Sequence, residues 1–256
     1  MGTEMGVAVL LKLVPDTTAK ITVSGDRVDE ASIGKWATSP YDEYALECAI
    51  QLRESGYGEI VAITCGKAES SKVLTDAAAV GADSLIHIMV EDDKLDSIQI
   101  QSLLSAAVKY SKSEVVVCGK QAADTNSGST GPGIASLLGF SCVGSVSTIS
   151  QNGESFLASR LGISGNEEVE VSAPCVFTFD KGETELRRPN VRGIMMAKKK
   201  PIEVLSASDL GVVIGESGVT IQAHSSPPEK SPGQIFQGAA SVPEVVGKLR
   251  DEANVI

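Results

Sequence analysis

Short apolar strands alternate with segments of helical periodicity through the first half of the chain. Val7–Val14 is a continuous apolar run broken only by Lys12, and Glu59–Gly66 and Ser84–Val90 are further runs of this kind. Strands that are apolar on both faces are typical of parallel sheets covered by helices. This alternation predicts an α/β fold with a doubly wound, mostly parallel sheet, in which Val7–Val14 lies centrally.

Helices are predicted between these strands. One is expected to begin at Ser39-Pro40, because a serine N-cap followed by proline at the first helical position is a strong start signal. Apolar residues then recur at the spacing i, i+3, i+4, i+7 as far as Gly56, and this face should pack on the sheet. Further helices are expected at Ser70–Ala79 and Ser97–Ser111. Lys20–Asp29 is expected to form a small hairpin before the first helix.

The segment Val115–Leu138 combines a strand, a polar loop and a helix. Its apolar strand is expected at Val115–Cys118, with Gly119 ending it, and we expect the helix to have Pro132 at its first position, where a missing N–H costs nothing. The loop 122–130 holds one acid, Asp124, and no basic residue, so its donors are backbone amides and hydroxyl groups. Free amides at a helix N-terminus bind phosphate. We therefore predict that the loop binds a nucleotide phosphate.

Glycine spacing narrows the kind of nucleotide site. Gly128, Gly131 and Gly133 follow the pattern G-x-x-G-x-G, which is the reverse of the dinucleotide fingerprint, and no Gly-Lys pair continues as a P-loop. The alternative is a polar connection that crosses the surface without binding anything. The loop is about twice as long as usual, which favours binding. We expect Gly131 to allow close approach of the backbone to the ligand.

Composition limits the class of protein. The chain has 256 residues, is 42% hydrophobic and carries a net charge of −11, which predicts a soluble globular protein and argues against a nucleic-acid surface. It contains no apolar run of membrane-spanning length, and its first residues lack a basic signal-peptide region, so we expect a cytoplasmic location. The five cysteines form no C-x-x-C and are expected to be reduced core residues. The two histidines have no ligand-like neighbours, so no metal site is predicted.

The second half of the chain begins with predicted strands that follow one another without intervening helices. Cys142–Ile149, Phe156–Ile163 and Val169–Phe179 are expected to be strands, with Asn152-Gly153 as a hairpin turn that makes them antiparallel additions to the sheet edge. Two buried strands of the first half end in Cys-Gly-Lys, in the segments VAITCGK and VVVCGKQ. They are expected to be neighbours whose carboxyl ends open on one crevice, although chance similarity is the alternative.

Residues 187–201 are basic and rich in turn residues, and Lys198–Lys200 reads as a solvated helix face. From Ser225 a linker with three prolines follows, too stiff and polar to build core. Ser241 and Glu244 suggest a capping box on a last amphipathic helix. We therefore divide the chain into an α/β nucleotide-binding domain, 1–224, and a linker with a helical arm, 225–256, that packs on a partner.

Several segments together carry a resemblance that covers nearly the whole chain. They look like the β subunit of electron transfer flavoproteins and comprise the N-terminal strand with Lys12, SPYDEYALE, AITCGK, VCGKQAADTNSGSTGPG and the late stretch from Arg187 to IMMAKKKPIE. The resemblance implies a Rossmann-like, adenine nucleotide α-hydrolase-like fold and a heterodimer with an α subunit that holds most of the FAD. The β subunit would shield part of this flavin and bind AMP or a second FAD itself. The heterodimer would pass electrons from dehydrogenases to an acceptor such as a quinone oxidoreductase, with the redox chemistry belonging to the flavin rather than to a catalytic side chain.

Matched position by position, the resemblance implies two sets of residues. The nucleotide site would use Leu10, Ser39, Pro40, Tyr41, Asp42, Cys65, Gly119, Lys120, Gln121, Ala122, Asp124, Thr125, Asn126, Ser127, Gly128, Ser129, Thr130, Gly131 and Pro132. A protruding loop for partner docking would use Arg187, Val191, Arg192, Ile194 and Met195, with Val191 in the place of the family's leucine. Gly131-Pro132 is similar to the electron-bifurcating branch.

One alternative belongs to a different class of protein. A stand-alone adenine-nucleotide-binding protein of the universal-stress or ATP-pyrophosphatase kind would share the α/β fold. The pyrophosphatase form requires a Ser-Gly-Gly-x-Asp-Ser loop after the first strand, where this chain has LVPDTTAK. That feature is absent, so the sequence favours the electron-transfer subunit.

Overall fold

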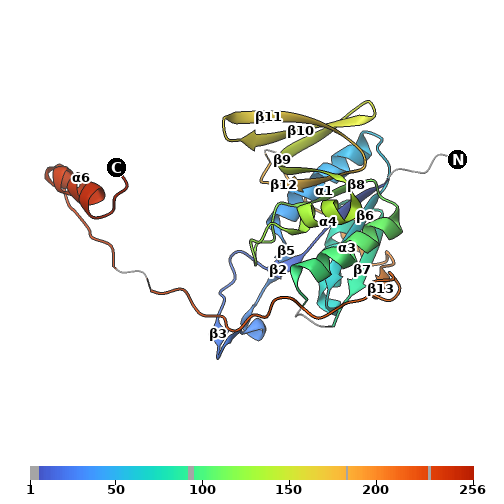
Figure 1. The fold of residues 1–256 in the computed structure, drawn as a ribbon, viewed down its shortest axis with the longest axis horizontal. Helices are drawn as coiled ribbons and strands as arrows, with labels where there is room; N and C mark the ends of the chain where they lie inside the picture. The colour runs from blue at the N-terminus through green and yellow to red at the C-terminus, as the bar shows by residue number, and fades with distance from the viewer. Residues whose placement is uncertain (1–5, 92–94, 183, 230–231) are drawn as a thin grey trace.

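The computed structural model describes residues 6–91, 95–182, 184–229 and 232–256 (Figure 1). Its main sheet has nine strands in the order β11-β10-β9-β12-β8-β1-β6-β7-β13. The parallel part comprises β1 (Val7–Leu10), β6 (Ile60–Gly66), β7 (Ser84–Met89), β8 (Val115–Gly119), β12 (Cys175–Phe179), β13 (Glu203–Leu205) and the start of β9 (Ser141–Asn152). β10 (Ser155–Gly162) and β11 (Gly165–Ser172) are antiparallel. The predicted sheet with antiparallel edge strands is confirmed.

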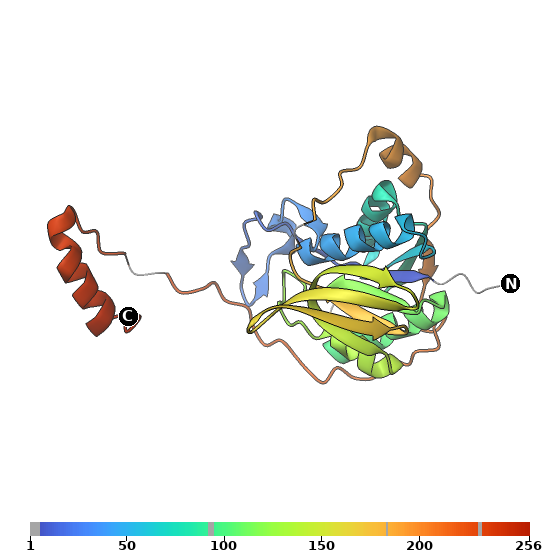
Figure 2. The same cartoon turned by 90° about the horizontal axis from the view of Figure 1, so that it is seen from above.

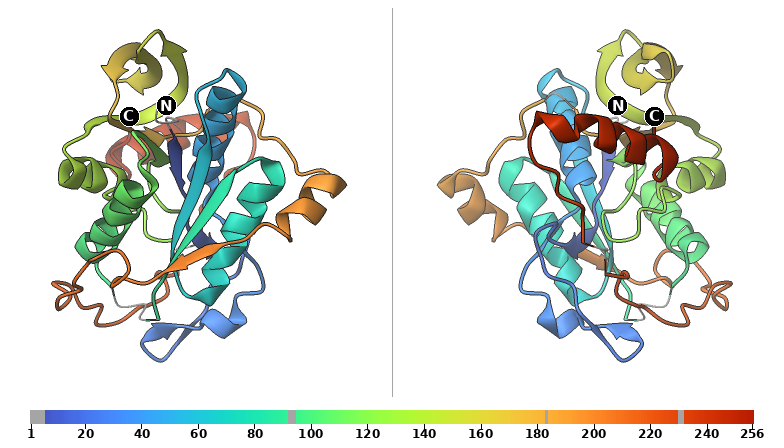
Figure 3. Two further views of the ribbon diagram at one scale, coloured as in Figure 1. Left: turned by 90° about the vertical axis from the view of Figure 1, so that its right-hand side faces the viewer. Right: turned by 90° about the vertical axis from the view of Figure 1, so that its left-hand side faces the viewer.

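Helices cover both faces of this sheet, as Figure 3 shows. α1 (Pro40–Glu54) and α2 (Ser71–Val80) pack on the face that carries Val7 and Val9. α3 (Ser97–Ser111) and α4 (Thr130–Leu138) pack on the opposite face with Ala8 and Leu10. Alternate residues of β1 thus serve the two cores, which explains its unbroken apolar sequence. Short 3₁₀ turns lie at Glu30–Ser32, Ala68–Ser70 and Ala239–Ser241.

The apolar run Val7–Val14 is not a single strand, contrary to expectation. β1 ends at Leu10, and β2 (Leu13–Pro15) leaves the main sheet to pair with β5 (Trp36–Thr38). The break lies at Lys12, whose backbone N–H donates to the Asp42 carboxylate and whose carbonyl accepts from the Ser39 N–H. These bonds to the start of α1 replace the ladder bonds of the main sheet. The small hairpin is confirmed as β3 (Val23–Ser24) and β4 (Arg27–Val28).

Two further strand predictions are corrected. The run Val169–Phe179 is divided at Ala173-Pro174 into β11 and β12, because proline has no N–H for a sheet ladder. β12 then inserts in parallel between β8 and β9, in the core. The two strands ending in Cys-Gly-Lys, β6 and β8, are not neighbours, since β1 lies between them. Cys142 is exposed, so it is not a core residue as expected.

The C-terminal segment leaves the body of the molecule. After β13 it passes the β3–β4 hairpin, where the Arg27 side chain donates to the Ile221 carbonyl and the His224 N–H to the Asp26 carbonyl. The arm then extends away and ends in α6 (Val242–Asp251), as two views show (Figures 1 and 2). The expected capping box does not form, because the Ser241 hydroxyl donates to the Gln237 carbonyl instead. Within the described residues, no helix is long and apolar enough to cross a membrane.

Candidate functional site

The carboxyl ends of β1, β6 and β8 meet at one edge of the sheet, as predicted. From β1 the chain builds β6 and β7 on one side, and it later places β8 and β12 on the other side. Ligands of open α/β sheets bind at such a switch in strand order. The start of α1 and the loop 120–129 between β8 and α4 both lie at this edge. We call this arrangement the crevice.

Asp42 holds the crevice together. Its carboxylate accepts the Gly119 N–H at 2.8 Å and the Lys12 N–H at 2.9 Å, so that one side chain joins the ends of β8 and β1. Burial raises the pKa of this carboxyl to about 7, although the two N–H groups act in the opposite direction. A Cβ on Gly119 would lie 2.6 Å from the Asp42 Oδ1 and 2.6 Å from the Tyr41 Cβ. Glycine at 119 therefore allows α1 to approach the strand end closely.

Ser39 is placed at the start of α1 as predicted, but its side chain makes no capping bond. The residue is fully buried, and its hydroxyl has no hydrogen-bond partner among the described residues. An unpaired buried hydroxyl costs free energy, so such groups in native proteins usually have a partner. The Ser39 hydroxyl is thus suited to a polar group of a ligand in the crevice.

The loop before α4 presents a row of backbone donors. Within the described part of the chain, the amides of residues 127–131 donate to no acceptor. Gly128 has φ +64° and is followed by Ser129 in the right-handed region, and such a pair turns successive amides toward a common point. The helix starts at Thr130 rather than at Pro132, so the proline is its third residue. These donors are of the kind that bind phosphate, as the sequence predicts.

We expected glycine at 131 to give a ligand close access to the backbone, but the structure gives a different reason. A Cβ there would lie 2.3 Å from the Thr178 Cγ2 and 3.1 Å from the Cys118 sulfur, inside the contact between α4 and the sheet. Its requirement is therefore close helix–sheet packing rather than room for a ligand. Gly133 is similar, since a Cβ there would meet the Gln101 side chain, which donates to the Ser129 carbonyl at 3.1 Å.

Two lysines border the crevice through ion pairs. The Lys12 ammonium lies 2.7 Å from the Asp124 carboxylate in the loop, and the Lys120 ammonium lies 2.7 Å from that of Asp180. Lys120 also lies 5.0 Å from the centre of the Tyr41 ring. Sequence reasoning did not include Lys12 or Asp180 in the site. Lys12 carried a signal, because it is the one charged residue in an apolar run.

The remaining predicted site residues lie at the same edge but differ in what they offer. The Leu10 side chain is buried in the core beneath α3 and α4, so this residue can offer a ligand only its backbone. Burial raises the pKa of the Cys65 thiol to about 12, so that it stays protonated. Gln121 and Asn126 bond to each other at 2.9 Å, and the Asn126 N–H donates to the Ala122 carbonyl, which stabilises the loop. Thr125 is exposed.

Comparison with known proteins identifies the family of the chain. The family model of the electron transfer flavoprotein domain matches residues 31–210, a span that includes the whole crevice except β1. A protein named electron transfer flavoprotein subunit beta from Bacillus subtilis is 34% identical over 258 residues, which cover 98% of this chain and all of that protein. The chain belongs to the electron transfer flavoprotein β-subunit family.

Further relatives extend the same family across distant organisms. The human electron transfer flavoprotein subunit beta is 31% identical and covers 97% of this chain and 98% of its own length. A mitochondrial electron transfer flavoprotein subunit beta from Oryza sativa subsp. japonica is 33% identical over 98% of this chain. These matches confirm the resemblance stated from the sequence. All three of these relatives are named as electron transfer flavoprotein subunits.

The predicted docking segment is a helix, not a loop. α5 (Val191–Ala197) starts from Asn190, whose side chain accepts the Gly193 N–H, and it projects beyond α2 in Figures 2 and 3. Glycine at 193 is needed there, because a Cβ would lie 2.4 Å from the Ala79 carbonyl oxygen. Exposed residues of α5 include Val191, Arg192, Ile194 and Met195.

Arg187 and Lys200 face the body of the molecule instead. The Arg187 guanidinium binds the Glu47 carboxylate at 2.8 Å and that of Glu54 at 2.7 Å, both on α1. It therefore fastens the segment before α5 to the body, and the docking role expected of Arg187 stays a prediction. The Lys200 ammonium donates to the carbonyls of Ala82 and Asp83, so it is not part of a solvated face.

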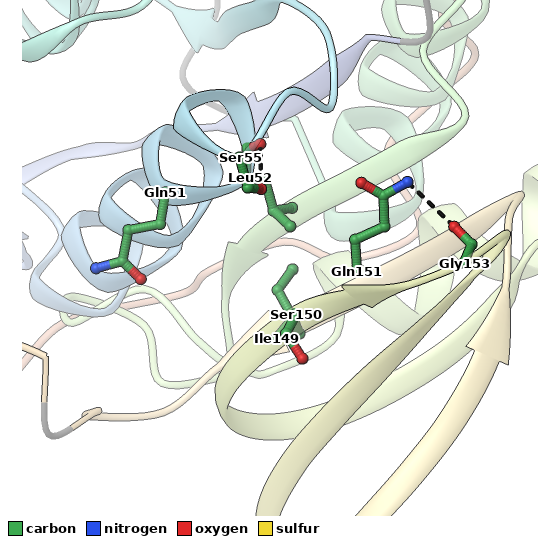
Figure 4. A pocket seen from close by; sticks show the side chains of 7 residues that line it. All are labelled: Gln51, Leu52, Ser55, Ile149, Ser150, Gln151 and Gly153. Atoms are coloured by element: carbon green, nitrogen blue, oxygen red, sulfur yellow. Dashed lines mark hydrogen bonds between the residues drawn. The ribbon is translucent and has the colours of Figure 1, made fainter.

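A surface cavity of about 590 Å³ lies away from the crevice, between the last turns of α1 and the β9–β10 turn (Figure 4). Leu52 and Ile149 are among the residues that line it, and the Gln151 amide, also in the lining, donates to the Gly153 carbonyl at 3.1 Å. The cavity lies at the C-terminal end of α1, whereas the crevice lies at its N-terminal end. Among the described residues, no group of three or more His, Cys, Asp or Glu is arranged to hold a metal ion.

Proposed function

We propose that the chain is the β subunit of a heterodimeric electron transfer flavoprotein and binds an adenine nucleotide, AMP or a second FAD, in the crevice. The carrying observation is the row of unpaired amides at 127–131, which ends at the N-terminus of α4. An α subunit would hold most of the FAD, with this chain shielding part of the flavin. The bound flavin supplies the electron-transfer chemistry. A cytoplasmic location remains part of this proposal.

The crevice residues divide the work of binding. The amides of 127–131, with the positive end of the α4 dipole behind them, receive the phosphate. The buried Ser39 hydroxyl supplies a polar contact, because it has no partner among the described residues. Asp42 acts on the ligand indirectly, by holding the ends of β1 and β8 at a fixed separation. These amide and hydroxyl donors are uncharged, so the loop itself can bind a phosphate without a basic side chain.

The exposed apolar side of α5 is proposed to dock electron-donating dehydrogenases. Val191 is 75% exposed and Met195 59%, and Arg192 adds a positive charge beside them. Exposed apolar side chains that gather on one surface mark an interaction site, and arginine is enriched in binding hot spots. The downstream acceptor, such as a quinone oxidoreductase, would use the same complex.

Gly128→Val is expected to empty the nucleotide site. The valine would have to adopt the left-handed φ of +64°, which costs about 1 kcal/mol or more, and the amides would turn away from the phosphate. Gly25→Val is a matched control, because Gly25 has φ +65° in the β3–β4 hairpin, with no atom within 4 Å of a Cβ. Nucleotide released by acid from the purified complexes is measured by chromatography. AMP and FAD in equal amounts indicate the AMP type, and two FAD without AMP the bifurcating type. Full nucleotide content in Gly128→Val would reject the loop as the site.

Deleting residues 225–256 is expected to weaken the heterodimer while the α/β domain stays folded. The arm extends away from the body and leaves Val242, Val246 and Leu249 of α6 exposed, which is the arrangement expected of a segment that packs on a partner (Figure 1). Gel filtration of co-expressed subunits measures association, and circular dichroism checks the fold. Equal association of the truncated and full-length chains would assign the arm another role.

A further inference from the structure

Lys12 follows β1 and contacts both the start of α1 and the loop before α4. Its N–H donates to Asp42 and its carbonyl accepts from Ser39, so its backbone is fixed against the start of α1. Its side chain crosses to the loop, where the ammonium lies 2.7 and 2.8 Å from the two oxygens of the Asp124 carboxylate. Asp124 is the only acid in the loop 122–130, which has no basic residue of its own.

The Lys12 ammonium can leave Asp124 for another anion at little cost. The side chains of Lys12 and Asp124 are 43% and 28% exposed, and pairs of this kind contribute little to stability. Asp124 stands three residues before the first of the unpaired amides. A phosphate on these amides would bring further negative charge close to the Asp124 carboxylate. A phosphate and a carboxylate close to each other repel unless a cation is shared between them.

We infer that Lys12 is the phosphate-binding cation of the crevice and is held in reserve by Asp124 until a phosphorylated nucleotide enters. The inference rests on the proposed nucleotide site and adds a determinant of specificity to it. The lysine favours the phosphorylated ligand over the uncharged nucleoside, because a charge-assisted hydrogen bond to phosphate has no counterpart in a nucleoside. Asp124 opposes the same step, since it competes for the ammonium and repels the phosphate.

The test uses two variants with opposite expected effects on the full-length chain, freed of bound nucleotide and titrated calorimetrically with AMP and with adenosine. Lys12→Met is expected to weaken AMP binding about tenfold and adenosine binding less than about twofold. Asp124→Asn is expected to tighten AMP binding about threefold and to leave adenosine unchanged. Lys248→Met is the control, because it removes the same charge from a similar exposed pair with Glu252 in the arm.

The outcomes separate this inference from the proposed site. Unchanged AMP affinity in Lys12→Met, or equal losses for AMP and adenosine, would overturn the role of Lys12 while leaving a nucleotide site in place. Weaker AMP binding in Asp124→Asn would overturn the reserve role of Asp124. A wild-type chain that binds neither AMP nor adenosine would reject the nucleotide site and this inference with it. A shallower dependence of AMP affinity on salt in Lys12→Met would add support.

Discussion

Gly119→Ala is expected to lower the free energy of unfolding by about 3 kcal/mol and to release nucleotide from the crevice. The new Cβ would lie 2.6 Å from the Asp42 Oδ1, 2.6 Å from the Tyr41 Cβ and 2.9 Å from the Asp42 amide nitrogen. These atoms belong to the first turn of α1, so relief of the clash requires the helix to move. Movement would break the bond between the Gly119 N–H and a carboxylate that is almost fully buried. Urea unfolding followed by circular dichroism measures the change.

The matched control for this substitution is Gly34→Ala. A Cβ on Gly34 meets no atom within 4 Å, and its φ lies outside the positive range that favours glycine, so its stability should change by less than about 0.5 kcal/mol. An unfolding midpoint in Gly119→Ala equal to that of the control would show that α1 can shift at no cost. In that case Asp42 would not fix the ends of β1 and β8.

Elements with local signals were predicted closely. α3 occupies Ser97–Ser111 as expected, and its start is fixed by a capping box of Asp96 and Gln99 that lies next to it in sequence. β8 differs from the predicted strand by one residue, because an apolar run ending in glycine defines it. The position of the crevice followed from the order of strands and helices, since carboxyl ends of parallel strands share one edge.

Elements governed by distant partners were not predicted. The end of β1 depends on Asp42, thirty residues away, whose carboxylate takes the Lys12 N–H out of the sheet. Nothing near Lys12 in the sequence signals this bond. The insertion of β12 between β8 and β9 is a long-range parallel pairing, for which the sequence carries no register information. The reason for Gly131 was also missed, because it depends on Thr178 in β12.

Arg187 shows that the contacts of a residue cannot be read from its neighbours in the sequence. It stands in a basic segment, and the family resemblance implied a docking role for it. In the fold its guanidinium donates to both oxygens of the Glu47 carboxylate, which is 6% exposed, and to the more exposed Glu54. These hydrogen bonds hold the pKa of Arg187 above its ordinary value. The partners lie more than 130 positions away in sequence.

Arg187→Met is therefore expected to lower the free energy of unfolding by about 3 kcal/mol, because it leaves the Glu47 carboxylate buried without its counter-charge. The double variant Arg187→Met/Glu47→Leu should recover most of this loss, since two apolar side chains can replace a buried ion pair at little cost. Arg192→Met is the control at an exposed arginine of α5, and its stability should stay within about 0.5 kcal/mol of the wild type. Chemical denaturation of the four chains measures these differences. A docking role for Arg187 would instead give an unchanged stability in Arg187→Met and a slower electron transfer from the partner dehydrogenase. A double variant as unstable as the single one would show that the segment before α5 needs the ion pair itself.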